Sequence, residues 1–239
     1  MKSRLIIAIV LSLFILYVLF YSLEDDELLG PNRTLENDGF ITMNAPKSVD
    51  VLARLPEGYQ FLDYTYSIKN ASLSTFHRDV TSSKTIYETK YPVYTLIVYL
   101  YDGKLLSVCP GSDKTNPFTN SRILNVWGPK GTAFLFDCDL LHAGCLNRCK
   151  KRELIQYKIC HKDDVHKLRH LNGINMTKEY VCKMSVWNHV IRKASYFFEM
   201  PINYFLYPFL SKRYDNDSTI GKIQSIIPIQ FYNNDIGTK

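Results

Sequence analysis

The cysteines of this 239-residue chain lack the close spacing that marks many zinc-binding pairs. All six lie between Cys109 and Cys182, and no two of them form a Cys-x-x-Cys motif. A zinc ribbon is therefore disfavoured, because its ligands come in such pairs. In an oxidising compartment these six cysteines would allow up to three disulfides, with fifteen possible pairings. The alternative is six reduced and mostly buried thiols.

Two further absences narrow the class of protein. No internal repeat is visible, and no nucleophile motif accompanies any cysteine. The formal charge is +6, but the basic clusters at 148–152 and 158–169 are not interleaved with aromatic residues as a nucleic-acid site would require. We therefore expect no nucleic-acid partner, and we interpret the clusters as a solvated face with one functional arginine.

Small residues are scarce where the apolar run at the N-terminus ends. Residues 5–21 are almost wholly apolar, Lys2 and Arg4 precede them, and acidic residues 24–27 follow. A cleaved signal peptide needs small residues at its cleavage site, so we favour an uncleaved signal-anchor transmembrane helix over residues 1–23. The basic residues before the run predict a single-pass membrane protein with a cytoplasmic N-terminus and with the rest of the chain lumenal or extracellular.

Four Asn-x-Ser/Thr triplets agree with export of the chain after the anchor. They begin at Asn32, Asn70, Asn175 and Asn216, and each is a glycan acceptor if it is lumenal. The sequence therefore predicts a membrane-bound glycoprotein.

The chain after the anchor divides by composition into three parts. Residues 24–50 are polar and lack periodicity, which predicts a stalk. Residues 51–195 hold short strand-like runs and then helical patterns at 163–171 and 178–195, which predict a mainly β sandwich or barrel with flanking helices. Residues 196–239 form an aromatic C-terminal extension, whose first part we expect to pack on the barrel rather than to rest on a membrane interface. The strand-like runs are 59–67, 74–80, 85–91, 94–101, 105–108, 133–136 and 154–160.

Two histidines, an aspartate and an arginine form the pattern that points to chemistry. His77 and Asp79 are two residues apart in a strand-like run, so both side chains point to one side and can chelate one metal. A third ligand must come from another strand, and His142 lies at the end of an apolar run. Two histidines and one carboxylate bind one face of an iron(II) and leave positions open for a cosubstrate and oxygen. Arg152 opens a further strand-like run and suits the distal carboxylate of a 2-oxo acid.

A His-x-Asp triplet by itself is a weak signal. The chain has a second triplet at His161 and Asp163, which we reject because no strand-like run followed by an arginine comes after it. For the triplet at 77–79 the alternative is a surface strand that carries an ion pair with Arg78 or Lys84.

Further residues between 74 and 160 fall into a characteristic order. They are His77, Asp79, Pro110-Gly111-Ser112, Lys114, Gly131, Phe134, Phe136, His142, Gly144, Asn147 and Arg152. This set resembles the phytanoyl-CoA dioxygenase-like branch of the iron(II)/2-oxoglutarate oxygenases. That branch typically shows His-x-Asp, a strand running into Pro-Gly-Ser-His-Lys, a glycine, a phenylalanine-rich strand and a second histidine. An asparagine and an arginine then follow, the arginine about ten residues past that histidine.

The resemblance implies a double-stranded β-helix, a jelly-roll or cupin-like fold of two antiparallel sheets. It implies a dioxygenase that hydroxylates an unidentified substrate, which is a small molecule, a lipid or a protein side chain. Iron(II) would be the cofactor, 2-oxoglutarate and oxygen would be consumed, and succinate and carbon dioxide would be released. His77, Asp79 and His142 would hold the metal, and Arg152 would bind the far carboxylate of 2-oxoglutarate. No catalytic residue is expected beyond the metal ligands.

Two positions depart from the pattern of this branch. Asp113 replaces the usual histidine of the Pro-Gly-Ser turn. Gly144 stands where several relatives carry a hydroxyl residue that touches the cosubstrate. Thr95 or Tyr99 would have to supply that hydrogen bond, so both are candidate cosubstrate-binding residues.

Two other functions stay open at this point. One is a catalytically inactive jelly-roll that serves as a binding or structural membrane protein, although the retention of all four residues argues against it. The other is a hydrolase or redox protein in which Cys145 is a nucleophile near His142. Convergence of His77, Asp79 and His142 on one point would favour the metal, whereas a Cys145–His142 pair turned away from them would favour the thiol.

Overall fold

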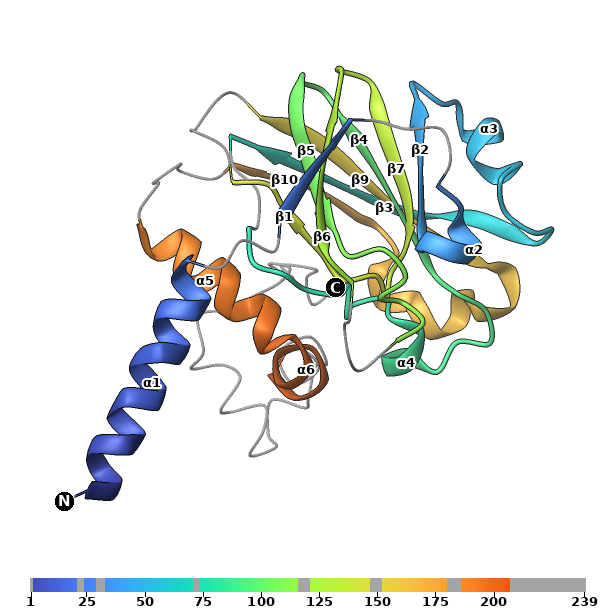
Figure 1. The fold of residues 1–239 in the computed structure, drawn as a ribbon. Helices are drawn as coiled ribbons and strands as arrows, with labels where there is room; N and C mark the ends of the chain where they lie inside the picture. Colours follow the sequence, from blue (N-terminus) through green and yellow to red (C-terminus); the bar gives the residue numbers. More distant parts are fainter. Residues whose placement is uncertain are drawn as a thin grey trace.

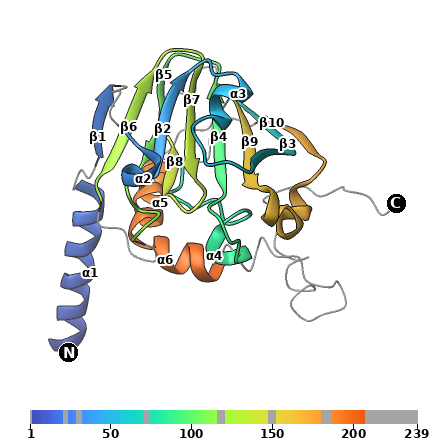
Figure 2. The ribbon, with the colours of Figure 1, turned by 90° about the vertical axis from the view of Figure 1, so that its right-hand side faces the viewer.

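Two β-sheets form the body of the protein, and helices lie around them (Figures 1 and 2). The computed structural model describes residues 2–20, 24–28, 33–70, 74–115, 121–146, 152–179 and 186–206.

The larger sheet has six strands in the order β10-β3-β9-β4-β7-β2, and the smaller has four in the order β1-β6-β5-β8. Neighbouring strands run antiparallel, apart from the parallel pairs β10–β3 and β1–β6. The strands of the larger sheet are β2 (Phe40–Asn44), β3 (Tyr59–Lys69), β4 (Tyr94–Tyr99), β7 (Thr132–Asp137), β9 (Glu153–His161) and β10 (Ile174–Glu179). Those of the smaller sheet are β1 (Glu24–Leu28), β5 (Gly103–Val108), β6 (Ile123–Gly128) and β8 (His142–Gly144).

The chain crosses between the two sheets in the manner of a jelly roll. From β3 in the larger sheet it passes to His77, which bridges to His142 of β8 in the smaller sheet. It then returns to β4, crosses to the β5–β6 hairpin, returns to β7, crosses to β8 and returns to β9. The prediction of a mainly β jelly-roll is therefore confirmed.

The core lies between the inner faces of the two sheets. Ile97 and Tyr99 of β4 and Phe134 and Phe136 of β7 alternate along their strands and point to one side. They meet side chains of the smaller sheet such as Leu106, and all of these residues are buried. The intervening residues are buried in a second apolar cluster on the other face, so β4 and β7 appear in the sequence as continuous apolar runs.

The helices and short helical turns lie outside the two sheets. They are α1 (Lys2–Phe20), α2 (Leu35–Asp38), α3 (Ser48–Leu52), α4 (Lys84–Tyr87), the 3₁₀ segment η1 (Lys162–Leu171), α5 (Val186–Phe197), α6 (Glu199–Pro201) and the π-helical turn η2 (Ile202–Leu206). Figures 1 and 2 show α1, α5 and α6 on one side of the sheets, with α1 projecting away from them.

The expectation of a polar stalk over residues 24–50 is wrong. This stretch contributes β1 to the smaller sheet and β2 to the larger, and Phe40 of β2 is only 1% exposed. Three acidic residues of β1 have basic partners: Glu24 pairs with Arg192 at 2.9 Å, Asp25 with Arg122 at 3.0 Å and Asp26 with Lys104 at 2.8 Å. The folded domain therefore begins before residue 51, and it extends past residue 195 into α6 and η2.

Two strand predictions between β3 and β4 also need correction. The run 85–91 overlaps the short helix α4 instead of forming a strand. The run 74–80 is reduced to the isolated bridge at His77. In the predicted helix 178–195, Lys178 and Glu179 belong to β10 and residues 186–195 to α5, while 180–185 lie outside the described residues. Trp187 of α5 is 70% exposed.

The apolar N-terminal segment is helical as α1. Within the described residues, no helix is both long enough and apolar enough to cross a membrane. The prediction of a spanning helix over residues 1–23 therefore finds no support in this part of the chain.

The cysteines in the described residues are free and buried: they are Cys109, Cys138, Cys145 and Cys160. A framework of three disulfides is thus not formed, and these four fit the alternative of buried thiols. Cys149 and Cys182 lie outside the described residues.

Candidate metal centre

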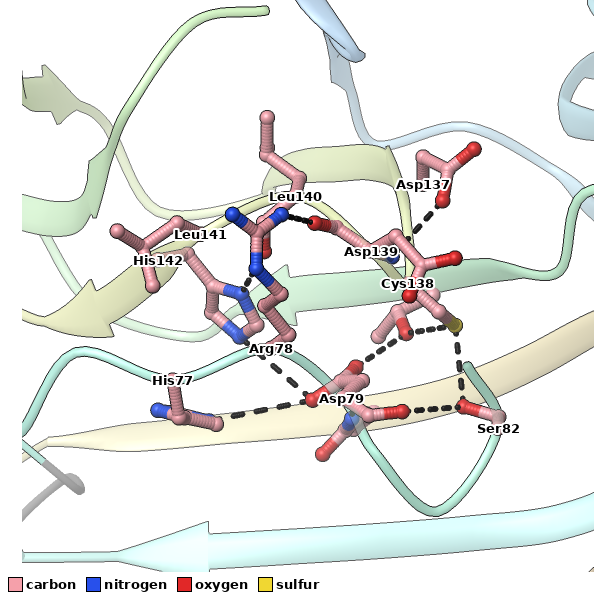
Figure 3. Close-up of polar contacts among 12 residues, drawn as sticks. His77, Arg78, Asp79, Ser82, Asp137, Cys138, Asp139, Leu140, Leu141 and His142 are labelled. Carbon is pink, nitrogen blue, oxygen red and sulfur yellow. Dashed lines mark hydrogen bonds and ion pairs between the residues drawn. The ribbon is translucent and has the colours of Figure 1, made fainter. Parts of the chain in front are cut away.

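A pair of backbone hydrogen bonds brings the predicted ligands together. His77 donates its N–H to His142 O at 2.9 Å, and His142 donates its N–H to His77 O at 3.0 Å. Asp79 points the same way as His77 because the two residues are two apart in extended chain. The two histidine Nε2 atoms and one Asp79 oxygen converge, with the three ligand atoms within 4.8 Å of one another (Figure 3).

Both histidines present the same nitrogen to this point. Nδ1 of His77 lies 2.9 Å from Thr75 O, and Nδ1 of His142 lies 2.9 Å from Leu140 O. A carbonyl only accepts, so each Nδ1 carries the proton and donates it. Each Nε2 is therefore an unprotonated lone pair aimed at the centre, which is the form that binds a metal.

Asp79 is held by its other oxygen. Its Oδ2 accepts hydrogen bonds from Thr95 Oγ1 at 2.5 Å and from Lys158 Nζ at 2.6 Å, and a longer one from Gln156 Nε2 at 3.4 Å. Its Oδ1 faces the two histidines, 3.6 Å from His142 Nε2 and 3.9 Å from His77 Nε2. Thr95 therefore orients the carboxylate that faces the two histidines, and its contact with a cosubstrate stays a prediction.

The protonation states of the three residues suit a cation. Burial lowers the pKa of His77, and burial together with the neighbouring His77 lowers the pKa of His142 to about 4. Burial by itself would raise the pKa of Asp79, but the charge of Lys158 is the largest of several opposing effects that hold this pKa well below its ordinary value. At neutral pH the site thus offers two neutral imidazoles and one carboxylate, the donor set that iron(II) takes.

The extended segment 76–78 is held, on the side away from β8, by side chains of α5 and η2. The N–H of Phe76 donates to Ser195 Oγ of α5 at 2.7 Å. The N–H of Arg78 donates to Asn203 Oδ1 of η2 at 2.8 Å. These two side chains take the place of a neighbouring strand, because residues 76 and 78 direct their N–H groups away from β8.

Arg78 completes this attachment and is not the surface residue of the alternative interpretation. It is 2% exposed, and its guanidinium pairs with Glu199 of α6 at 3.0 Å. It also donates to Ser112 O at 2.8 Å and to Asp139 O. The expectation that the start of the C-terminal extension packs on the barrel is confirmed by these contacts of Glu199 and Asn203.

The remaining candidates lie deeper in the barrel. Arg152 is 2% exposed, donates to Cys145 O at 2.6 Å and to Leu105 O, and lies 5.2 Å from the centre of the Tyr101 ring. Tyr99 is fully buried, and its hydroxyl has no hydrogen-bond partner among the described residues. Neither residue contacts the three metal ligands.

Lys158 is the residue of this centre that sequence reasoning missed. A lysine in a strand reads as solvent-facing, whereas this one is fully buried beside Asp79. A signal was present, because Lys158 follows Arg152 by six residues and an even spacing on one strand places both on the same face.

Cys145 and His161 belong to the two alternative sites, and both contact other residues. Cys145 Sγ lies 3.2 Å from Ser107 Oγ, and burial raises the pKa of this thiol. It makes no pair with His142, so the structure does not support a thiol nucleophile. His161 approaches Asp163 at 3.5 Å, but among the described residues the only cluster that could hold a metal is the one at His77.

The comparisons with known proteins show weak likeness to oxygenases. No protein-family model matches this chain, and no curated protein sequence does. Among solved structures, HygX from Streptomyces hygroscopicus with nickel and 2-oxoglutarate bound is 14% identical, with 54% of this chain and 84% of that chain covered and a TM-score of 0.39. The non-haem α-ketoglutarate-dependent epimerase SnoN from nogalamycin biosynthesis is 13% identical, with 54% and 80% covered and a TM-score of 0.37.

In two other similar structures the matched region covers less than half of the other chain. The matched region covers 29% of EvdMO1, at 17% identity over 46% of this chain and a TM-score of 0.36. It covers 49% of the non-haem monooxygenase ThoJ, at 14% identity over 47% of this chain and a TM-score of 0.37. Likenesses of this size assign neither a family nor an activity, so the function has to be argued from the site.

Replacing Thr95 tests whether its hydroxyl serves the metal ligand. Thr95→Val keeps the shape and removes the donor to Asp79, so the affinity for manganese(II) should fall by roughly 10-fold. The affinity of the metal-loaded protein for 2-oxoglutarate should not change. Both are measured by titration calorimetry, with Thr65→Val on β3 as the control. A loss confined to 2-oxoglutarate would show that Thr95 faces the cosubstrate after all.

Proposed function

We propose that this protein is an iron(II)- and 2-oxoglutarate-dependent dioxygenase that hydroxylates its substrate, in the manner of the phytanoyl-CoA dioxygenase-like branch. One observation carries the proposal: two histidine Nε2 atoms and one carboxylate oxygen converge, while their Nδ1 and Oδ2 atoms are fixed by hydrogen bonds. A ligand set of this kind, held on one face of the ion, leaves positions open for a cosubstrate and oxygen.

Arg152 is the residue for the far carboxylate of 2-oxoglutarate. Arg152 directly precedes β9 and lies on the same inward-facing side of the chain as Lys158, the partner of Asp79. Its burial in the barrel strengthens a charge-assisted pair, because a low-dielectric surrounding screens charges poorly. Tyr99 supports the same role, since its buried hydroxyl is available to donate to a bound carboxylate.

The protein would contribute binding, orientation and exclusion of water. His77, Asp79 and His142 would hold the iron, which together with 2-oxoglutarate and oxygen supplies the oxidising power for hydroxylation. Thr95 and Lys158 keep Asp79 ionised and turned toward the histidines. The burial of His142 and Asp79, 3% and 9% exposed, limits access of bulk water to the centre.

A catalytically inactive jelly-roll is the second candidate. It predicts the same fold without metal affinity, so metal binding separates the two. The ligand-ready protonation states argue for the enzyme, because a buried carboxylate and two buried imidazoles have no need to converge in a purely structural core.

Removing a histidine ligand tests the metal assignment. The purified protein should bind about one manganese(II) or iron(II) per chain, and His77→Ala and His142→Ala should each abolish this binding, since two protein ligands coordinate too weakly. His166→Ala, on the exposed side of η1, serves as the matched control and should bind normally. Metal content is measured after gel filtration. Retained binding in both ligand variants would refute the assignment.

Removing the arginine tests the cosubstrate assignment. Arg152→Leu should weaken 2-oxoglutarate binding by about 2–5 kcal/mol, because a buried bidentate charge pair is lost. Metal binding should persist. Calorimetry on the metal-loaded protein measures both, with the exposed Arg169→Leu as control. Equal losses in the two arginine variants would place the carboxylate elsewhere.

We also propose that residues 1–23 anchor the protein and that the catalytic domain is lumenal or extracellular. The support is the apolar run between Lys2 or Arg4 and the acidic β1. Expressed in a glycosylating cell, the chain should stay with membranes in alkaline carbonate and lose mass on endoglycosidase treatment. Asn70 and Asn175 are the acceptor sites among the described residues, while Asn32 and Asn216 lie outside them. An unglycosylated, membrane-bound chain would reverse the orientation.

A further inference from the structure

Helix α5 presents apolar side chains to the outside. Trp187, Ile191 and Phe198 follow one another at the spacing of a single helical face and are 70%, 51% and 50% exposed. Phe205 and Leu206 of η2 continue this surface and are 68% and 46% exposed. We call these five residues the α5–η2 patch.

Beside this stripe, roughly a quarter-turn around the helix, the same segment carries polar side chains that are buried. Arg192 is 2% exposed and donates to Gly144 O at 2.9 Å, to Ser107 Oγ at 2.6 Å and to Glu24 Oε1 at 2.9 Å. Ser195 and Glu199, 4% exposed each, bind Phe76 and Arg78. The segment therefore buries three polar side chains while it leaves large apolar ones outside, which a helix on a water-exposed surface does not normally do.

Helix α1 extends the apolar surface. It packs on α5 through Phe14 and Tyr17, whose rings lie 6.4 and 6.1 Å from the ring of Phe197. Its exposed apolar residues cover the whole circumference rather than one stripe, since consecutive positions such as Leu5, Ile6 and Ile7 are 58–63% exposed. Figures 1 and 2 show α1 leaving the body on the side where α5 and α6 lie.

We infer that the α5–η2 patch rests on a lipid bilayer beside α1, so that the jelly-roll domain itself contacts the membrane. A protein partner would fit the stripe on α5, but its groove would cover one side of α1 only. A bilayer surrounds an apolar helix on every side and accepts tryptophan and phenylalanine at its interface. Phe197 contacts α1 and is followed in the chain by Phe198 of the patch, so we assign the same partner to both surfaces.

This contact fixes the position of the metal centre relative to the membrane. The helices whose apolar side meets lipid hold, with their polar side, the N–H groups on either side of His77. The inference rests on the proposed membrane anchor but not on the proposed oxygenase activity, because it concerns only the outer face of these helices.

The two tryptophans of the chain provide a direct test. Trp187 lies in the patch, whereas Trp127 lies at the far end of β6 from Ser121, whose carbonyl contacts Tyr196 of α5. Full-length Trp127→Phe protein leaves Trp187 as the only tryptophan, and Trp187→Phe leaves Trp127. Each is reconstituted into phosphatidylcholine vesicles and into vesicles of the same lipid with brominated acyl chains, which quench nearby tryptophans.

Emission of Trp187 should drop in the brominated vesicles, and emission of Trp127 should be equal in the two kinds of vesicle. Adding Ile191→Ser and Phe198→Ser to the Trp127→Phe protein should reduce the quenching of Trp187. Val49→Ser, which changes a 76% exposed residue on α3, should leave it unaltered. Equal emission of Trp187 in both vesicles would overturn the inference and show that a second copy, another protein or the chain's own C-terminal residues cover the patch.

Discussion

The two backbone hydrogen bonds between His77 and His142 are the constraint on which the metal centre depends. They join a segment of the smaller sheet to β8 and bring two residues 65 positions apart within reach of one ion. The other edge of that segment is bonded to Ser195 and Asn203, so it is held between a strand and two helical side chains. Asp79 has attachments of its own, to Thr95, Lys158 and Gln156 through its side chain and to Cys138 O through its N–H.

The convergence of His77 and Asp79 could be predicted from the sequence, because the direction of side chains along an extended chain depends only on residue spacing. His77 and Asp79 share a side at spacing i, i+2, and β4 and β7 are short apolar runs that are buried on both faces. The attachments of the segment could not be predicted, since Arg78 finds Glu199 at a separation of 121 residues. The role of Lys158 was hidden for another reason: a charge in a strand normally marks the solvent face, and only a buried carboxylate reverses that rule.

The errors in the predicted fold arise because composition was used to infer structure. Residues 24–50 are polar enough to read as a stalk, yet β1 pairs with β6 through backbone hydrogen bonds that composition does not reveal. The exposure of Trp187 could not be predicted from composition either, because the apolar residues of a helix normally pack inward. On α5 the buried face instead satisfies the carbonyl and carboxylate partners of Arg192, and the apolar face is left outside.

The central claim is that His77, Asp79 and His142 bind one iron(II) ion. Anomalous diffraction from crystals loaded with iron(II) under anaerobic conditions, recorded on both sides of the iron absorption edge, tests it most directly. The account predicts one peak, bounded by Nε2 of both histidines and Oδ1 of Asp79. A peak bound by other residues, or none at this position in iron-loaded crystals, would contradict it.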